Sequence, residues 1–342
     1  MANRPTMADL ARAAGVSVAT VDRVLNGRAA VREETAQRIY AVAHEIGYHA
    51  AAVIKQRMQA ELPDMPLGFV LQKERQAFYR TFADEIDEAV RLAQGVRATA
   101  RIVFAAAQDP KEVVALMTAL APKVRGIAAV AVDHHDITNA VAALKAKGVP
   151  TFALLSDFAQ GVRHSYIGLN NIKVGRIAAW TIAKTAKPGK VALFVGGHRW
   201  HGHALRETGF RSYFREHAPQ FQVLDTLVNL ETRRLTYEAT LDLLERHPDL
   251  RGFYVAGGGM EGAIAAARET RKPEEIAIVV NEVTPESTEG LQDRYVTLVD
   301  ATPLRRLCQD LVGLMIDAAR QGVSITPGQH FLPPDLLVPE SV

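Results

Sequence analysis

A chain of 342 residues is longer than one small domain, and its length predicts two or three domains. Hydrophobic residues make up 48% and charged residues 23%, which is typical of globular domains with sizeable cores. No apolar run approaches the about 20 residues of a membrane helix, so we expect no membrane partner.

Cysteine content and charge bear on where the chain works. The N-terminus lacks the apolar stretch and cleavage site of a signal peptide, and the single cysteine, Cys308, cannot form an intramolecular disulfide. Both features favour a reducing cytoplasm. The net charge of +2 comes entirely from residues 1–62, which hold eight Lys/Arg and six Asp/Glu. This excess is too small to indicate nucleic acid, so any such inference must rest on geometry.

The first fifty residues predict three short helices around a small core. The first helix ends at Gly15, where a tight turn can use positive φ. The second is capped by Ser17 and stops at Asn26, and the third runs from about Arg32 to Gly47. Three such helices, with a short turn between the first two, predict a helix-turn-helix domain.

A joint follows this domain. Residues 49–63 are rich in Ala, Lys, Gln and Met, which favour helix, but so short a helix is marginal alone in water. The segment either folds when something docks on it or is an ordinary linker. The pattern therefore divides the chain into residues 1–48, the joint 49–63 and the remainder 64–342.

From residue 67 onward, apolar strands alternate with amphipathic helices. Strands are predicted at 67–71, 101–104, 125–132, 150–155, 190–195, 252–256 and 276–280, and helices at about 78–93, 110–120, 136–146, 171–186, 202–217, 233–247 and 259–269. This alternation is typical of parallel sheets covered on both faces. Because the strands are too many for one Rossmann-like unit, we expect two doubly wound lobes, of about 64–160 with 292–322 and 161–291 with 323–342. Ligands bind beyond the carboxyl ends of such strands, which places a site between the lobes.

The segment from Met7 to Tyr48, MADLARAAGVSVATVDRVLNGRAAVREETAQRIYAVAHEIGY, resembles the DNA-binding domain of the lactose-repressor (LacI/GalR) family. The matching features are the AxxAGVS turn, TVxRVLNG in the second helix, V-x-EET at the start of the third and the closing IGY. The two-lobed remainder resembles the effector domain of that family, which is periplasmic-binding-protein-like. The likeness thus covers nearly the whole chain.

This resemblance implies a ligand-responsive transcriptional regulator, with repression as the expected effect. Two copies are expected to bind a pseudo-palindromic operator in double-stranded DNA, because one reader domain buries too little surface. The ending LPPDLLVPESV has no leucine heptads, which favours a homodimer over the tetramer. The expected effector is a sugar, a polyol or a sugar acid or phosphate, no cofactor is expected, and the location is cytoplasmic and nucleoid-associated.

In such a domain the second helix enters the major groove with its first residues facing the base edges. Those residues are Val18, Ala19 and Arg23, and Arg23 can form paired hydrogen bonds with guanine worth about 1–3 kcal/mol. Val18 and Ala19 can only touch apolar groups such as a thymine methyl. Phosphate contacts, with simple helix capping as the alternative, are predicted for Thr6, Ser17, Thr20 and Asn26.

The chain departs from the pattern of the family at three places. Asp22 replaces a small hydroxyl residue, and its carboxylate either points to solvent, pairs with an arginine or accepts from a cytosine. Arg32 replaces a serine cap, which weakens that cap by about 1 kcal/mol. Arg57 stands where the family inserts a leucine into the minor groove. Either Met58 is that wedge in a rotated helix, or Arg57 enters an A·T-rich groove.

The resemblance also implies effector-site residues in the first lobe and beside it. Phe78 and Tyr79 match aromatic positions at the cleft, with core packing as the alternative. Asp157 matches a position that holds a sugar hydroxyl, for which a carboxylate is a strong acceptor. Arg206 matches the ligand-clamping arginine of the family, and Asp133, after another predicted strand, is expected to face the cleft.

The second lobe departs from the usual pocket. Gly257 begins a glycine run in place of an Asn-Asp pair, and Asn281-Glu282 stands in place of an aspartate. Backbone N–H groups of such a run before a helix favour anions. His198 and Trp200 add an imidazole and a ring that could stack on a sugar face. This pattern favours a polyol or sugar that carries a phosphate or carboxylate.

Three nearby histidines, His198, His201 and His203, also allow a zinc hypothesis. No carboxylate or thiolate stands at helical metal spacing, so hydrogen bonding to the effector or a surface position is favoured and no metal is predicted. His134 and His135 are typical of a solvated loop. The sequence has no P-loop, nucleophile elbow or thiol–histidine arrangement, so no enzymatic activity is predicted. A periplasmic solute-binding protein is the main alternative, disfavoured by the fused reader domain, and a sugar-active enzyme is the third.

Overall fold

The computed structural model describes residues 4–26, 31–60, 62–324 and 326–342. The chain divides into two compact units, residues 1–65 with 93–99 and residues 66–92 with 100–342. In these described ranges, every helix is too short or too polar to cross a membrane.

The N-terminal unit is helical, as predicted. It contains α1 (Met7–Ala13), α2 (Val18–Asn26), α3 (Glu33–Glu45) and α4 (Ala51–Ala60). The hydroxyl of Thr6 accepts from the N–H of Asp9, whose carboxylate accepts from the N–H of Thr6 in return, so the predicted cap of α1 is confirmed. Gly15 follows α1 with a φ of +64°, and Arg32 precedes α3 without a side-chain cap.

One apolar cluster holds these helices together. Leu10, Val21, Ile39 and Ile54, one from each helix, have no exposed surface. Ile54 thus places α4 in the same core as the three predicted helices. The first part of the predicted joint therefore folds as part of the N-terminal unit, because its apolar side chain is docked there.

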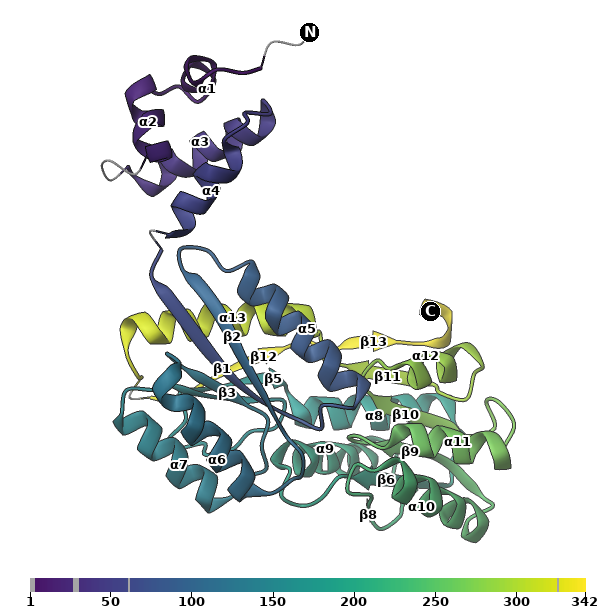
Figure 1. Cartoon of the computed structure of the whole chain (residues 1–342). Helices are drawn as coiled ribbons and strands as arrows, with labels where there is room; N and C mark the ends of the chain where they lie inside the picture. Colours follow the sequence, from purple (N-terminus) through teal and green to yellow (C-terminus); the bar gives the residue numbers. More distant parts are fainter. Residues whose placement is uncertain (1–3, 27–30, 61, 325) are drawn as a thin grey trace. The chain divides into compact units, whose positions relative to one another are not determined.

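The larger unit is built on two sheets, which define its two lobes (Figure 1). The first sheet has the order β12-β5-β4-β3-β1-β2, with β1 (Asp64–Gln72), β2 (Arg97–Ala105), β3 (Ile127–Ala129), β4 (Thr151–Leu154), β5 (Ser165–Leu169) and β12 (Gly328–Leu332). The second has the order β13-β11-β10-β9-β6-β7, with β6 (Lys190–Val195), β7 (Gln222–Val223), β9 (Leu250–Val255), β10 (Ala277–Asn281), β11 (Leu298–Ala301) and β13 (Asp335–Leu337). The short β8 (Leu227–Val228) also pairs with β6. The pairs β1–β3, β3–β4, β4–β5, β6–β9, β9–β10 and β10–β11 are parallel, and β13 runs antiparallel to β11.

Helices pack in pairs on these sheets. In the first lobe α5 (Ala77–Arg91) packs with α13 (Leu304–Gln321), and α6 (Pro110–Leu120) with α7 (His135–Ala146). In the second lobe α8 (Asn171–Thr185) packs with α9 (His201–His217), and α10 (Arg233–Arg246) with α11 (Met260–Thr270), which contacts α12 (Pro285–Gln292). Short 3₁₀ turns span Ala121–Lys123 and Pro339–Ser341. The predicted two-lobed α/β fold is confirmed.

The chain crosses between the lobes at other places than the sequence predicts. β5 and β12 belong to the first sheet, although both fall in ranges assigned to the second lobe. Conversely, β11 belongs to the second sheet although residues 292–322 are assigned to the first lobe. These strands are short, and their sheet neighbours come from distant parts of the chain. Local periodicity therefore cannot assign them to a lobe.

Candidate ligand cavity and DNA-reading helix

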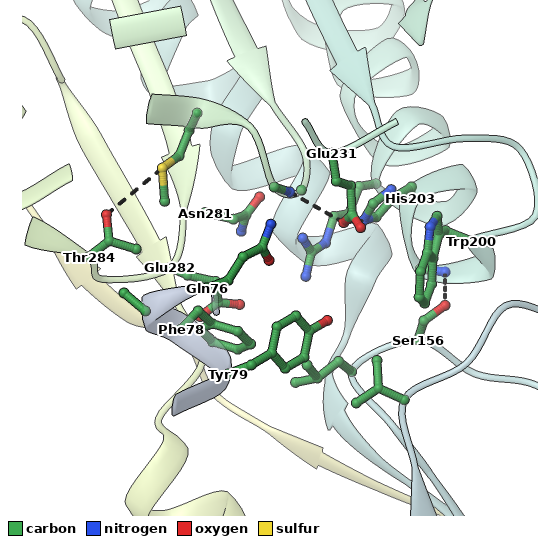
Figure 2. Close-up of a pocket in the computed structure, with 18 of the residues that line it drawn as sticks. Gln76, Phe78, Tyr79, Ser156, Trp200, His203, Glu231, Asn281, Glu282 and Thr284 are labelled. Carbon is green, nitrogen blue, oxygen red and sulfur yellow. Dashed lines mark hydrogen bonds and ion pairs between the residues drawn. The ribbon is translucent and has the colours of Figure 1, made fainter. Parts of the chain in front are cut away.

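A cavity of about 90 Å³ lies between the two lobes of the larger unit (Figure 2). The first lobe lines it with the start of α5 and with residues after β3 and β4. The second lobe adds the start of α9 and residues after β8, β9 and β10. Each segment follows a strand, as expected where parallel sheets bind ligands. The size suits a small molecule rather than a polymer.

Aromatic rings form part of the cavity wall. Phe78 and Tyr79 stand in the first turn of α5 with ring centroids 5.1 Å apart in an edge-to-face arrangement. The Tyr79 hydroxyl points into the space that the labelled side chains surround (Figure 2), and burial raises its pKa well above the usual value. Trp200, just before α9, is 4% exposed, and its indole N–H has no hydrogen-bond partner among the described residues. Such groups can pack on a sugar face and donate to a hydroxyl oxygen.

Arg206 of α9 is held rigidly in the wall. Its Nε donates to Oδ1 of Asn171 at 2.7 Å, and its Nη1 donates to the carbonyl oxygen of Ala256 at 2.8 Å. Burial acts to lower the pKa of Arg206, but the neighbouring acidic groups, including Glu282 and Asp300, raise it. The guanidinium therefore stays charged. Its Nη2 donates no hydrogen bond within the described part of the chain, which leaves donors for a ligand.

Two acidic residues stand behind and beside this arginine. Glu282, with a φ of +70°, accepts from the Thr302 hydroxyl at 2.8 Å and from the Thr302 N–H at 2.9 Å. Burial raises the pKa of Glu282. Both carboxylate oxygens of Asp300 are buried without a hydrogen-bond partner among the described residues, and burial raises the pKa of Asp300 to about 7. Burial thus favours the neutral form of both acids, and the positive charge of Arg206 opposes this by lowering their pKa.

Glu231 connects the two lobes across the cavity. It follows β8 with a φ of +53°. Its Oε2 accepts from Nε2 of Gln108 at 2.9 Å and lies 3.5 Å from Nζ of Lys73, and both of these residues belong to the first lobe. Its Oε1 accepts from the N–H of Gly258 in the second lobe at 3.3 Å. One carboxylate thus ties both sides of the cleft together.

His203 of α9 is a neutral imidazole beside Glu231. Its Nδ1 accepts from the N–H of Gly196 at 3.0 Å, so the proton is on Nε2, which lies 3.6 Å from Oε1 of Glu231. Burial lowers the pKa of His203 to about 4. The ring therefore contributes a hydrogen-bond donor and no positive charge.

In the N-terminal unit, α2 presents an uncovered face. Val18 is 48% exposed, Ala19 and Arg23 are also exposed, and Val21 and Val24 on the opposite face are buried. The hydroxyl of Ser17 accepts from the N–H of Thr20 at 3.1 Å and lies 2.8 Å from the Thr20 hydroxyl, so the Ser17 cap of α2 is formed. Among the described residues, the predicted base-reading side chains thus share one exposed face of α2.

Comparison with known proteins identifies the chain. Residues 67–305 match the family described as periplasmic binding protein domain, and residues 6–50 match the bacterial regulatory proteins of the lacI family. The chain belongs to the LacI family. It is therefore a DNA-binding, ligand-responsive transcription regulator and not an enzyme.

One relative of this LacI-family protein matches nearly its whole length, and others match parts of it. The "HTH-type transcriptional regulator DegA" of Bacillus subtilis is 23% identical over 99% of this chain and 98% of the relative. The "HTH-type transcriptional regulator GntR" of Pseudomonas aeruginosa is 25% identical over 81% of this chain and 79% of the relative.

Solute-binding proteins of Agrobacterium vitis share the fold of the larger unit. One with bound D-fucose has a TM-score of 0.71 at 15% identity, covering 80% of this chain and 95% of that protein. Another with bound α-D-tagatopyranose has a TM-score of 0.72 at 18% identity, covering 81% and 95%.

Seven of the ten residues predicted to bind the effector line the cavity of this LacI-family protein, and three do not. Its wall includes Phe78, Tyr79, Trp200, Arg206, Gly257, Asn281 and Glu282. Outside it, Asp157 is buried, and both of its carboxylate oxygens accept hydrogen bonds from Arg163, with Nη2 2.7 Å from Oδ2. Asp133 is exposed and accepts from the N–H of Ala159 at 3.4 Å, and His198 is exposed.

The structure describes only some of the side chains that are predicted to contact DNA. Arg57 and Met58 lie on α4, but their side chains are outside the described part, so the choice between them remains a prediction. Asp22 accepts from Nδ2 of Asn26 at 2.6 Å, a partner that is not among those predicted from the sequence. This bond occupies the Asn26 amide that is predicted to contact phosphate.

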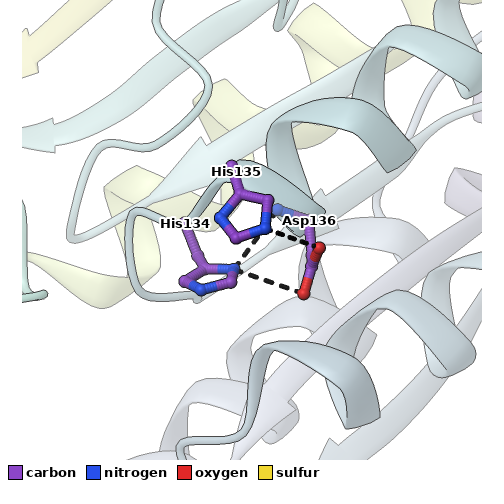
Figure 3. Close-up of side chains that lie close together, drawn as sticks. All are labelled: His134, His135 and Asp136. Atoms are coloured by element: carbon purple, nitrogen blue, oxygen red, sulfur yellow. Dashed lines mark hydrogen bonds and ion pairs between the residues drawn. The ribbon is translucent and has the colours of Figure 1, made fainter.

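His198, His201 and His203 are not among the groups of side chains that lie close enough to hold a metal ion in the described part of the chain. His203 is turned toward Gly196, and His201 has Nε2 2.8 Å from Nε2 of Gln160. Within the described residues, the nearest grouping of potential ligands is instead His134, His135 and Asp136 (Figure 3). There Nδ1 of His134 accepts from the N–H of Asp136 at 3.2 Å and caps α7. Because Nδ1 of His134 already accepts this hydrogen bond, the grouping of these three consecutive residues is explained by the start of α7.

Two acidic wall residues are missed by sequence reasoning. Glu261 stands two residues after the glycine run, in the first turn of α11, so its position after a strand end offered a recognisable signal. Glu231 follows β8, a strand of two residues that hydrophobic periodicity cannot detect.

Proposed function

We propose that this LacI-family regulator is a repressor that binds a pseudo-palindromic operator as a homodimer and is released or tuned by a small sugar or polyol. The observation that carries the proposal is a cavity between two lobes, lined by aromatic rings and Arg206, in a chain that also has an uncovered α2. The cytoplasm, at the nucleoid, is where such a protein meets its operator.

The exposed face of α2 supports the DNA part of the proposal. Arg23 is exposed and can donate to guanine, and Val18 and Ala19 can contact thymine methyl groups. Two such helices are needed because one small module gives too little interface for specific binding. The homodimer follows from this requirement.

The chemistry of the cavity supports the effector part. The unpartnered donors of Arg206 and Trp200 suit hydroxyl oxygens, and the rings of Phe78 and Tyr79 suit an apolar sugar face. A sugar acid or phosphate, which the glycine run alone favours, fits less well. The Gly258 N–H that would bind such an anion already donates to Glu231.

Operator selection followed by ligand titration tests this function. The full-length protein selects duplexes from a random library, and fluorescence anisotropy then measures operator affinity with a panel of sugars and polyols. We expect at least one compound to change the affinity by about 5- to 150-fold, the usual range of allosteric coupling.

Substitution of Arg206 then assigns that response to the cavity. Arg206→Ala should abolish it and leave ligand-free operator affinity unchanged, which also reports that the variant folds. Arg215→Ala, an exposed arginine on the same helix, serves as the control and should keep the response. A full response in Arg206→Ala would refute the cavity as the effector site.

A further inference from the structure

The cavity wall carries an excess of negative charge. Among its described residues, Glu231, Glu261 and Glu282 are acidic and Arg206 is basic, while His203 is neutral because burial holds its pKa at about 4. An anionic ligand would meet repulsion from this wall. An uncharged or cationic ligand would not.

Most of these charges are already compensated by the protein. Arg206 has Glu282 and the buried Asp300 as neighbours. Glu231 has Lys73 at 3.5 Å and a hydrogen bond from Gly258. These contacts remove Arg206 and Glu231 as free partners for a charged ligand.

Glu261 is the exception. It lies in the first turn of α11, and no lysine or arginine nitrogen lies within 4.0 Å of its carboxylate among the described residues. Burial raises the pKa of Glu261 and Glu286 raises it further, while a hydrogen bond from its own backbone N–H, together with Arg233 and Lys73, acts to lower it. A cation beside this carboxylate would supply the missing charge partner. The alternative is that Glu261 only interacts with the positive end of the helix.

The glycine run does not offer a vacant anion site. The Glu231 side chain lies against it, because a Cβ at Gly258 would stand 3.0 Å from Cβ of Glu231, and one at Gly257 would stand 3.0 Å from its Oε1. The glycines therefore make room for a carboxylate of the protein itself.

Two further side chains mark the cavity as a ligand site independently of these acids. Trp200 is only 4% exposed, and its indole N–H has no hydrogen-bond partner among the described residues. Arg206 is 7% exposed and lines the cavity, and its Nη2 donates no hydrogen bond among the described residues. Both are donors that need acceptor oxygens, as hydroxyl groups provide.

We propose that the effector is a small polyhydroxy compound bearing a primary ammonium group, which binds beside Glu261 while its hydroxyl oxygens accept from Arg206 and Trp200. The inference rests on the proposed function of the cavity as the effector site. The aromatic wall is compatible with it, because rings attract cations as well as sugar faces.

Calorimetric titration of the full-length protein with matched sugars tests the charge. The probes are D-glucosamine, D-galactosamine and D-mannosamine, each with its neutral parent, its N-acetyl derivative and the 6-phosphate of the parent. We expect one amino sugar to bind at least about tenfold more tightly than its parent and its N-acetyl derivative. A neutral or phosphorylated sugar that binds as well as or better than the amine overturns the ammonium proposal and leaves the proposed function standing.

Glu261→Gln should reduce the preference for the amine over its parent to less than about threefold. Glu286→Gln is the control, since Glu286 acts on Glu261 but does not line the cavity, and it should keep the preference. An unchanged preference in Glu261→Gln overturns the assignment and leaves Glu261 as a helix-start residue. If no sugar in the panel binds or alters operator affinity, both this inference and the effector part of the proposed function fail.

Discussion

Arg23 and Asp22 are neighbours on α2 with opposite consequences for DNA binding. Arg23 is exposed, so its donors are available for a base edge. Asp22 places a negative charge on the same helix, and its hydrogen bond with Asn26 holds that carboxylate along the helix. We expect the arginine to supply most of the sequence discrimination, because the other exposed residues at the start of α2 are apolar.

Arg23→Ala should lower affinity for the selected operator by about 1–3 kcal/mol, the value of one paired arginine–guanine contact. Affinity for a scrambled duplex should fall much less, because phosphate contacts supply that binding. Anisotropy at fixed salt on both duplexes measures the difference. Arg38→Ala, an exposed arginine on α3, is the control. Equal losses on the two duplexes would show that Arg23 contacts phosphate.

At the scale of elements, α4 is the unexpected feature of the N-terminal unit. The sequence leaves open whether residues 49–63 fold, since a short helix of Ala, Lys and Gln is marginal alone. Ile54 resolves this for α4 because it is fully buried with Leu10, Val21 and Ile39. The stability of α4 is thus linked to the core of the reading domain.

Ile54→Ala should therefore destabilise the whole N-terminal unit by about 2–4 kcal/mol, through lost burial and the cavity left behind. Hydrogen exchange of the full-length protein should show lower protection in α1, α2 and α3 as well as in α4. Val53→Ala, whose side chain is 45% exposed, is the matched control and should change little. Loss of protection confined to α4 would show that α4 is only an attached segment.

Sequence patterns predict the elements with long periodic runs and miss those defined by distant partners. The strands β1, β6 and β9 contain continuous apolar residues and are predicted close to their observed ranges. β5, β11, β12 and β13 are short, and their lobe is fixed by pairing across the sheet rather than by local composition.

The same distinction holds for the cavity. Arg206, Trp200 and Glu282 follow strands or begin helices, so their place at the cleft is predictable. Asp157 also follows a strand, but its ion pair with Arg163 directs it elsewhere, and a local sequence does not reveal that partner. Glu231 reaches the cavity through a left-handed backbone conformation after β8, which nothing in its sequence neighbourhood indicates.

At the scale of the whole molecule, regulation requires that ligand binding and operator binding influence each other. Glu231 is placed to take part, because it is bonded to Gln108 and Lys73 of the first lobe and to Gly258 of the second. We expect a ligand that enters the cavity to change the balance of these contacts across the cleft. A response occurs only if the rearrangement of the lobes that accompanies ligand binding costs a different free energy in the operator-bound protein than in the free protein.

This coupling is measurable as a reciprocal effect. The affinity of the full-length protein for the effector found by titration is measured twice, free and saturated with operator, in the same buffer and salt. The effector should bind less tightly to the operator complex, by the same factor by which it weakens operator binding, because linkage is symmetric. Equal effector affinity in the two states, with the cavity demonstrably occupied, would show that the lobes and the reading helices act independently.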